Sequence, residues 1–429
     1  CVSNDLWRKT VSLETDIRCL HRRNLRPTQN AGNSKPVNVT TPCRILGARS
    51  AVALLFTGKD VRYFGQRFGC RVAVHSICIS KIVSICIPLL ELKPYIGPLN
   101  VMRKAMPSNL INEDNYIEIS GLCDATIHLK VEGLNPAGSI KLKTAISIIR
   151  ALELEKRIKG DTYLIESSSG NLGVALAMVC AQRGHKFVCV IDPNTSSQNR
   201  KLISAMGAQV ITVEEKDENG GYLNTRIQTI KDIVSQNPNY IWLNQYKNPE
   251  NPRAHFNTTA KSISDRFSRI DYLFVGAGTT GTLMGCNQFF AKHRPETKVV
   301  AVDSVGSVTF GLPAGSRYIP GLGTSRKPEI FDPTGLHSAI HIPELQTIQV
   351  CRWLAKSRGF LAGGSTGTVL AAIYEWRGRL DRDDVVVAIS PDMGERYLDT
   401  IYSDDWVADR FGEQALVPFL ETHLTTKVA

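Results

Sequence analysis

The sequence lacks the patterns that mark several classes of protein. No two of its 11 cysteines form a CxxC pair, so the usual spacing of a zinc site is absent and no metal is expected. The best candidate for a membrane span, residues 77–92, is interrupted by Lys81 and Pro88 and contains Glu91. No repeat of fixed period is visible. We therefore expect a globular protein without a membrane segment, located in the cytoplasm.

Negative charge is scarce at the front of the chain. The formal net charge of +11 would suggest a polyanionic partner such as nucleic acid. However, residues 1–107 hold 17 Lys and Arg against 5 Asp and Glu, whereas the rest holds 34 against 35. The body is near neutral, so no nucleic-acid partner is expected. The basic front end is an organelle targeting segment, a poorly ordered tail, or sequence upstream of the true start.

From about residue 95 the hydrophobic pattern becomes regular. Strands are predicted at residues 125–132, 163–165, 186–191, 209–213, 272–275, 299–302 and 385–389. Helices are predicted at residues 139–154, 171–183 and 198–205. Strands that alternate with helices indicate an open, mostly parallel sheet, and ligands bind such sheets at the carboxyl ends of the strands.

The first loop that joins a strand to a helix is Asn135-Pro-Ala-Gly-Ser-Ile-Lys141. Pro136 and Gly138 predict a turn, and Ser139 is a candidate N-cap. Lys141 then falls in the first helical turn, where the helix dipole disfavours a cation and lowers the pKa of the amine. Such an amine suits condensation with an aldehyde, although an ordinary surface lysine fits this loop equally well.

The second loop, Glu166-Ser-Ser-Ser-Gly-Asn-Leu-Gly173, is rich in hydroxyl groups. Ser168, Ser169 and Asn171 stand where a strand turns into a helix, and hydroxyls and free backbone N–H groups there can bind a carboxylate. A capped helix without any ligand would have the same sequence.

The third loop, Gly276-Ala-Gly-Thr-Thr-Gly-Thr282, offers a phosphate site at a helix start. Its glycines also match the GxGxxG dinucleotide fingerprint, and Asp303 follows where a ribose-binding acid is expected. A nicotinamide-dependent dehydrogenase therefore stays open on this spacing. The hydroxyls of Thr279, Thr280 and Thr282 suit a phosphate monoester better, and a dehydrogenase needs neither of the first two loops.

A glycine-rich turn, Ala362-Gly-Gly-Ser-Thr-Gly367, supplies another hydroxyl. Ser365 can bond to a pyridine nitrogen without enforcing its protonation. This limits carbanion build-up and favours β-elimination over transamination. Taken alone, the segment is only a turn.

In combination, these segments resemble fold-type II pyridoxal-phosphate enzymes, the cysteine synthase and cystathionine β-synthase group, over about residues 95–407. The resemblance implies a tryptophan synthase β-like α/β fold with two open, mostly parallel-sheet domains, pyridoxal 5'-phosphate as cofactor, small amino-acid substrates and a homodimer. The larger domain would comprise residues 95–135 and 246–407, and the smaller, mobile domain residues 136–245. An irregular N-terminal extension (1–94) and a C-terminal tail (408–429) would flank them.

The resemblance also assigns a role to each loop. Lys141 would hold the cofactor, Asn171 would contact its phenolic oxygen, and Ser365 would contact its pyridine nitrogen. The cofactor phosphate would be bound by Gly278, Thr279, Thr280, Gly281 and Thr282, and the substrate carboxylate by Ser168, Ser169, Gly170 and Gln245. Residues 245–251 and 391–397 match two further segments of the family.

Departures from the family pattern narrow the range of possible substrates. Leu142-Lys143 stands where cysteine synthases have Asp-Arg, and Tyr246 replaces their Phe. Ser168 replaces a Thr, and Thr280 replaces a Gly of the phosphate loop. These differences are more similar to the siderophore-associated branch. Its enzymes join O-phospho-L-serine to L-glutamate and give N-(2-amino-2-carboxyethyl)-L-glutamate, a precursor of 2,3-diaminopropionate.

An incoming glutamate brings two carboxylates. Arg226 and Tyr246 are the candidates for selecting it, and Arg317 or Arg326 for meeting the leaving phosphate. Within the family, a cysteine synthase that uses O-acetylserine or O-phosphoserine with sulfide is the alternative, and an amino-acid dehydratase shares the fold. A non-catalytic sensor would be expected to lose Lys141.

Overall fold

The computed structural model describes residues 111–218, 220–417 and 419, together with three short strands near the N-terminus. These are β1 (Val52–Thr57), β2 (Asp60–Arg67) and β3 (Cys70–Arg71), which form an antiparallel sheet where the sequence analysis predicted no strand. They belong to a compact unit of their own, Cys1–Gly97, and the rest of the chain, Pro98–Ala429, forms the second unit. The predicted loops all lie in the second unit.

The larger sheet of the second unit has six strands in the order β12-β11-β10-β13-β5-β4. Its members are β4 (Tyr116–Ile119), β5 (Ile127–Val131), β10 (Tyr272–Gly276), β11 (Lys298–Ser304), β12 (Ser338–Ile342) and β13 (Val386–Ser390). All neighbours run parallel except β4 and β5. The sequence predicted the four strands that carry long apolar runs but missed β4 and β12, which are only partly buried.

The smaller sheet has four parallel strands in the order β8-β7-β6-β9. They are β6 (Tyr163–Ser167), β7 (Lys186–Ile191), β8 (Gln209–Thr212) and β9 (Tyr240–Trp242). With the larger sheet, it confirms the expected α/β class with parallel sheets. Parallel strands place their carboxyl ends at one edge, so the loops that follow β6 and β9 start side by side.

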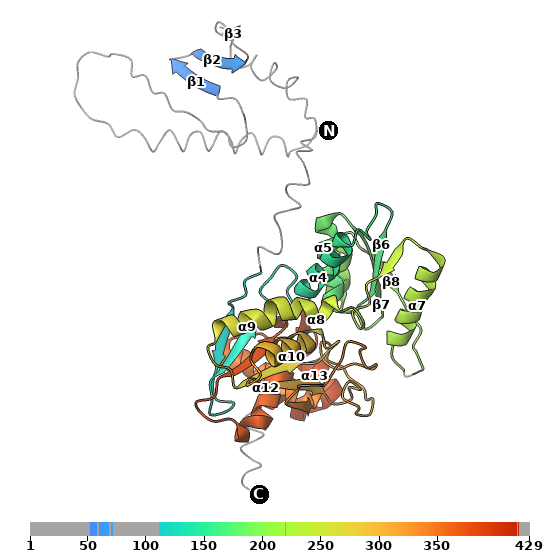
Figure 1. Cartoon of the computed structure of the whole chain (residues 1–429), viewed down its shortest axis with the longest axis vertical. Helices are drawn as coiled ribbons and strands as arrows, with labels where there is room; N and C mark the ends of the chain where they lie inside the picture. The colour runs from blue at the N-terminus through green and yellow to red at the C-terminus, as the bar shows by residue number, and fades with distance from the viewer. Residues whose placement is uncertain are drawn as a thin grey trace, which may run out of the picture. The chain divides into compact units, whose positions relative to one another are not determined.

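Helices connect the strands of both sheets (Figure 1). Those among the smaller sheet's strands are α4 (Lys141–Leu154), α5 (Asn171–Arg183), α6 (Ser197–Ala205) and α7 (Leu223–Gln236). The remaining ones are α8 (Glu250–His255), the π-helix η2 (Phe256–Ala260), α9 (Lys261–Arg266), α10 (Gly281–His293), α11 (Glu344–Arg358), α12 (Gly364–Trp376) and α13 (Asp404–Phe411). Short 3-10 turns are η3 (Arg377–Arg379), η4 (Gly394–Tyr397) and η5 (Glu413–Leu416).

The ends of two helices test the predicted caps. Helix α5 ends at Arg183, as predicted, because Gly184 takes a left-handed conformation with φ of 73°. Helix α4 begins without the predicted Ser139 cap. Ile140 occupies the N-cap position, and the buried Ser139 hydroxyl has no hydrogen-bond partner among the described residues. Ser139 instead bridges to the backbone of Asp392, which draws the start of α4 towards the segment after β13.

The described residues contain neither a membrane-spanning helix nor a cluster of metal ligands. No helix there is long and apolar enough to pass through a bilayer. No group of three or more His, Cys, Asp or Glu side chains is placed to hold a metal ion within those residues.

Candidate active site

Lys141 is the first residue of α4 and is partly buried. Burial lowers the pKa of its amine to about 8, and the nearby Asp392 opposes this shift. Desolvation rather than the helix dipole is therefore the main cause, which corrects the physical reason given by the sequence. A lysine with a pKa near 8 is neutral about half the time at that pH, and the neutral amine is the nucleophile.

Asp392 lies beside the Lys141 segment, in the loop after β13. It is buried, and burial raises the pKa of its carboxyl group. Tyr397 Oη donates to Asp392 Oδ2 at 2.5 Å, and Asn171 Nδ2 donates to the same oxygen at 2.7 Å. The carboxylate thus joins residues from both sheets. The sequence analysis quoted this segment but did not single out Asp392.

Asn171, the first residue of α5, is held at both ends of its amide. Its Nδ2 donates to Asp392, and its Oδ1 accepts from Arg396. Arg396 also donates to the carbonyl of Ala137 at 2.6 Å. The three segments of Ala137, Asn171 and Asp392 therefore converge on one point, as the order of loops along the sheets requires.

The hydroxyl-rich loop after β6 divides into fixed and open groups. Ser168 Oγ accepts from Gly173 N, in the first turn of α5, at 2.9 Å. Ser169 is partly exposed, and its carbonyl accepts from Asn199. A Cβ built on Gly170 would meet no atom within 4 Å. Space for a ligand therefore exists beside Gly170, while Ser168 shapes the loop.

Glu166 fixes Gln245 against the same loop. The buried Glu166 carboxyl accepts from Ser167 N at 2.8 Å and from Gln245 N at 3.2 Å, and burial raises its pKa to about 7. Gln245 Nε2 donates to Ser167 O at 3.2 Å. The segment after β9 is thereby locked beside the loop after β6.

The loop before α10 is tightly enclosed and contains a strained residue. Thr280 has φ of 63°, a left-handed conformation in which a β-branched side chain is an outlier. Its hydroxyl is buried and has no partner among the described residues. A Cβ on Gly278 would lie 2.7 Å from Gly321 O, and one on Gly281 would collide with Asn251. The loop is a cradle that only glycines at these places permit.

The cradle is supported from behind by two side chains that the sequence analysis did not identify. Asn251 Nδ2 donates to Thr279 Oγ1 at 3.2 Å. The buried His255 lies 3.3 Å from Thr282 Oγ1 and 3.1 Å from Thr144 Oγ1. Burial and the charge of Lys141 hold the pKa of His255 well below its ordinary value, so the ring is neutral. Both support residues lie in or just after the matched segment 245–251.

Ser365, near the start of α12, is buried close to the cradle and to Asp392. A Cβ on Gly321 would lie 3.8 Å from Ser365 Oγ. The Ser365 hydroxyl also counteracts the effect of burial on the pKa of the Asp392 carboxyl, although less than Tyr397 and Asn171 do. The four predicted parts (Lys141, the loop after β6, the cradle and Ser365) are thus connected through shared neighbours.

Arg226 and Tyr246 form a second group. Arg226 is buried on α7, and its Nε lies 3.3 Å from Asp192 Oδ2. Burial raises the pKa of the Tyr246 phenol, while the charges of Arg226 and Arg326 lower it. The Arg326 guanidinium lies 5.5 Å from the centre of the Tyr246 ring. Arg317 differs, because its guanidinium binds Gly306 O and the hydroxyl of Ser325.

Comparison with known proteins decides between the two cofactors left open by the sequence. The family described as "Pyridoxal-phosphate dependent enzyme" matches residues 115–392, which include Lys141, the loop after β6, the cradle before α10 and Ser365. The chain belongs to this family. Its cofactor is pyridoxal 5'-phosphate.

Relatives within this pyridoxal-phosphate family agree on the type of chemistry. The chain is 42% identical over 285 residues to the N-(2-amino-2-carboxyethyl)-L-glutamate synthase of Ralstonia nicotianae, covering 66% of this chain and 84% of the relative. The crystal structure of O-ureido-L-serine synthase is 31% identical, with a TM-score of 0.63 over 70% of this chain and 98% of that one. The crystal structure of the O-acetylserine dependent cystathionine β-synthase of Helicobacter pylori is 26% identical, with a TM-score of 0.64. This match covers 69% of this chain and 97% of that one. The chain is accordingly a pyridoxal-phosphate enzyme of the β-substituting transferase type.

The residues present fit this cofactor. Thr280 offers a buried hydroxyl without a partner, and Gly278 and Gly281 leave no room for side chains around it. The dinucleotide-binding interpretation required Asp303 as the acid that binds a ribose. The carboxyl of Asp303 is buried, accepts from Ser304 N at 2.8 Å, and has its pKa raised by burial to about 6. Asp303 closes its own turn and is not presented to a ribose.

Proposed function

We propose that this enzyme replaces the phosphate of O-phospho-L-serine with the amine of L-glutamate. The product would be N-(2-amino-2-carboxyethyl)-L-glutamate, a precursor of 2,3-diaminopropionate in siderophore biosynthesis. The observation that carries the proposal is the Lys141 amine, with a pKa of about 8, whose charge also lowers the pKa of His255 behind the glycine and threonine cradle. The name of the Ralstonia nicotianae relative and the basic group around Tyr246 support these two substrates.

Lys141 would do the proton chemistry. When bound, pyridoxal phosphate supplies an aldehyde for the amine and an electron sink for the substrate carbon. The low pKa of Lys141 keeps much of its amine neutral, so Nζ can hold the cofactor and later act as a base. Lys141 Nζ would also remove the α-proton of the amino acid and return a proton after the new bond forms.

The remaining predicted residues would position the groups that react. Thr279, Thr280 and Thr282 would donate to the cofactor phosphate, with Gly278 and Gly281 allowing its close approach. Ser365 would face the pyridine nitrogen, and Asn171 the phenolic oxygen in exchange for one of its present partners. Ser169, Gly170 and Gln245 would bind the substrate carboxylate, in a loop that the Ser168 hydroxyl holds to the start of α5.

Arg226 and Tyr246 would favour glutamate over sulfide as the nucleophile. Glutamate carries a net negative charge, and a buried guanidinium beside a phenol attracts a carboxylate strongly in a site of low polarity. Sulfide needs no such group. The alternative cysteine synthase activity would leave this arrangement without a use.

A product assay tests the proposal. Purified enzyme loaded with pyridoxal phosphate is given O-phosphoserine with glutamate, or with sulfide, and the product is identified by mass. We expect the glutamate adduct and inorganic phosphate. Cysteine as the only product would show that glutamate is not the nucleophile, without changing the assignment to the pyridoxal-phosphate family. A visible absorbance band that disappears in Lys141→Ala confirms the lysine in the same preparation.

A further inference from the structure

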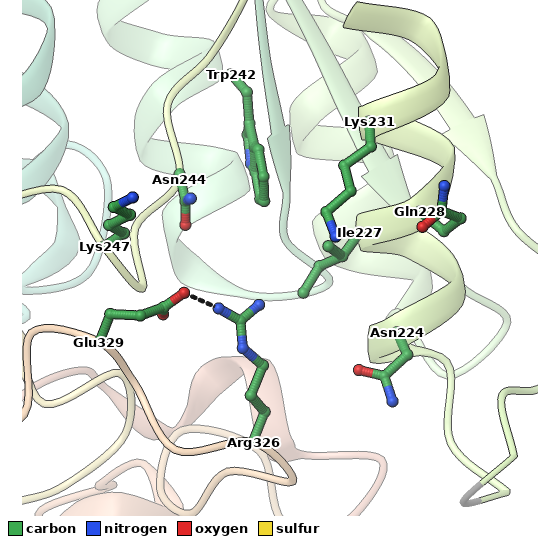
Figure 2. Close-up of a pocket in the computed structure, with 9 residues that line it drawn as sticks. All are labelled: Asn224, Ile227, Gln228, Lys231, Trp242, Asn244, Lys247, Arg326 and Glu329. Carbon is green, nitrogen blue, oxygen red and sulfur yellow. Dashed lines mark hydrogen bonds and ion pairs between the residues drawn. The ribbon is translucent and has the colours of Figure 1, made fainter. Parts of the chain in front are cut away.

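A pocket of about 510 Å³ opens beside Tyr246, outside the residues that the proposed reaction uses. Figure 2 shows three elements around it: α7, the segment from β9 to Lys247, and the loop that contains Arg326 and Glu329. The first two belong to the smaller sheet's region and the third to the larger one. The pocket therefore lies at the seam between the two sheets.

The pocket is rich in positive charge. Lys231 and Lys247 line it, and neither has a carboxylate partner among the described residues. Arg326 also lines it and pairs with Glu329, the single acid of the lining. Two cationic groups are thus left over for an anion. In Figure 2 the Lys231 side chain runs along the inner side of α7 towards Ile227, and Arg326 reaches into the pocket from the opposite wall.

The lining also offers neutral polar groups. Asn224 and Gln228 stand one turn apart on α7. Asn244 follows β9 with φ of 47°, and its buried Oδ1 has no partner among the described residues. An unpaired buried amide oxygen is costly unless water or a ligand satisfies it. The pocket is therefore built for a polar, anionic guest rather than an apolar one.

The wall of this pocket is continuous with the candidate active site. Asn244 is followed directly by Gln245, which binds the loop after β6, and by Tyr246. Arg326 belongs to both places, since it lines the pocket and stacks over the Tyr246 ring at 5.5 Å. A molecule in the pocket would have one end next to the group of Arg226 and Tyr246.

We propose that this pocket binds the side-chain carboxylate of the amine donor, with Lys231 and Lys247 as the recognising cations. The inference rests on the proposed function, because it takes L-glutamate as the second substrate. One carboxylate of glutamate would lie among the lysines, and its amine would point past Tyr246 towards the candidate active site. The pocket thus selects a dicarboxylic amino acid over a neutral one.

Steady-state kinetics of the holoenzyme test the assignment. The double variant Lys231→Gln, Lys247→Gln should raise the KM for glutamate about tenfold, as loss of charge-assisted contacts predicts. The KM for O-phosphoserine and the rate of phosphate release in the first half-reaction should stay unchanged. Both lysines are exposed, so folding is not at risk. Lys261→Gln on α9, an equally exposed lysine, is the matched control.

Replacing glutamate by glutamine as the nucleophile tests the effect of the side-chain carboxylate charge alone. The wild type should prefer glutamate to glutamine, and the double variant should lose most of that preference, while Lys231→Arg with Lys247→Arg should keep it. An unchanged glutamate KM in the double variant, or an increase confined to O-phosphoserine, overturns the pocket assignment and leaves the proposed reaction intact. A wild type that forms no adduct with glutamate overturns the proposed reaction itself.

Discussion

At the scale of single residues, the chemistry depends on groups whose surroundings oppose their ordinary state. Lys141 is a cation kept partly neutral by burial, and Thr280 is a β-branched residue held in a left-handed conformation. Asp392 and Glu166 are carboxyls whose pKa values burial raises. Such departures gather at functional sites because the rest of the fold can stabilise them.

The pKa of Lys141 predicts how cofactor loading depends on pH. Because the folded pKa is lowered to about 8, the amine gains its proton below that value and becomes unreactive. The rate at which apoenzyme takes up pyridoxal phosphate should therefore rise between pH 6.5 and 9 with a midpoint near 8. Stopped-flow absorbance measures it. A midpoint near 10 would mean that the lysine is not desolvated in solution.

Removal of the amine should be far more damaging than removal of a surface charge. Lys141→Ala should lower kcat by about 10³-fold or more, since general acid–base catalysis alone supplies about 10²- to 10⁴-fold. Borohydride reduction followed by peptide mass analysis should find the pyridoxyl group on Lys141 in the wild type and nowhere in the variant. Lys261→Ala is the control and should match the wild type.

Substitution of Thr280 should affect the stability of the fold and the affinity for the cofactor differently. Thr280→Gly relieves a conformation that strains a β-branched residue by about 1–3 kcal/mol, so the free energy of unfolding of the apoenzyme should fall little or rise. Loss of the hydroxyl should weaken pyridoxal phosphate binding about tenfold. Urea unfolding and fluorescence titration measure the two quantities. Thr280→Ser, which keeps the hydroxyl, should bind the cofactor normally; equal affinity in all three proteins contradicts the assigned contact.

At the scale of elements, α4 is fixed by a buried cluster of charges directly behind Lys141. Lys143 Nζ lies 2.7 Å from Glu132 and from Glu113, and donates to Thr259 at 3.2 Å. Burial alone would raise the pKa of Glu113, but the charges of Lys143 and Lys130 outweigh it and hold the pKa below its ordinary value. This stabilising contribution is present above pH 4.5 and is lost as the pH falls below it.

Breaking the cluster should destabilise the fold strongly. Glu132→Gln leaves Lys143 with one carboxylate partner, Glu113, which is itself partly exposed, and removal of one member of a buried pair costs about 3–5 kcal/mol. Chemical denaturation of the apoenzyme at pH 7 measures the loss. Glu155→Gln removes an exposed pair with Arg157 and should change the unfolding free energy by less than about 1 kcal/mol. Similar losses in both variants would contradict the role of burial.

The same elements show what a sequence can and cannot predict. The end of α5 at Arg183 and the cradle before α10 are local patterns of turn residues and periodicity, and they were predicted. The helix of Lys141 was also predicted, but with a start at Ser139, whereas α4 begins at Lys141. Asp392 and His255 were missed because their partners lie far away in the chain: Asn171 is 221 positions from Asp392, and Thr144 is 111 from His255. Local periodicity does not encode such pairings.

At the scale of the whole molecule, the charge asymmetry follows the division into two units. The excess of Lys and Arg lies almost entirely before residue 107, whereas the unit Pro98–Ala429 contains all the residues of the candidate site. The expectations of a targeting segment, a poorly ordered tail or sequence upstream of the true start fall largely outside the described residues. The predicted homodimer and the predicted domain boundaries stay predictions.

The catalytic unit should work without the basic front end. A chain that starts at Pro98 keeps every contact described for the site, so its kcat and its KM values should agree with those of the full chain within about twofold. Side-by-side assays of the two proteins measure this. Size-exclusion chromatography with light scattering on the same samples tests the homodimer. Loss of activity with an intact fold would mean that the front unit acts on the site.

The side-chain amide of Asn171 has a consequence for the geometry of the enzyme before the cofactor binds. Two hydrogen bonds, each with a net contribution of about 1 kcal/mol to stability, join the loop after β6 to the segment after β13. Because the cofactor's phenolic oxygen would take the place of one of these partners, cofactor binding would exchange one of the bonds and keep the other. The enzyme without cofactor therefore holds Asn171 in a defined geometry that the cofactor is able to change.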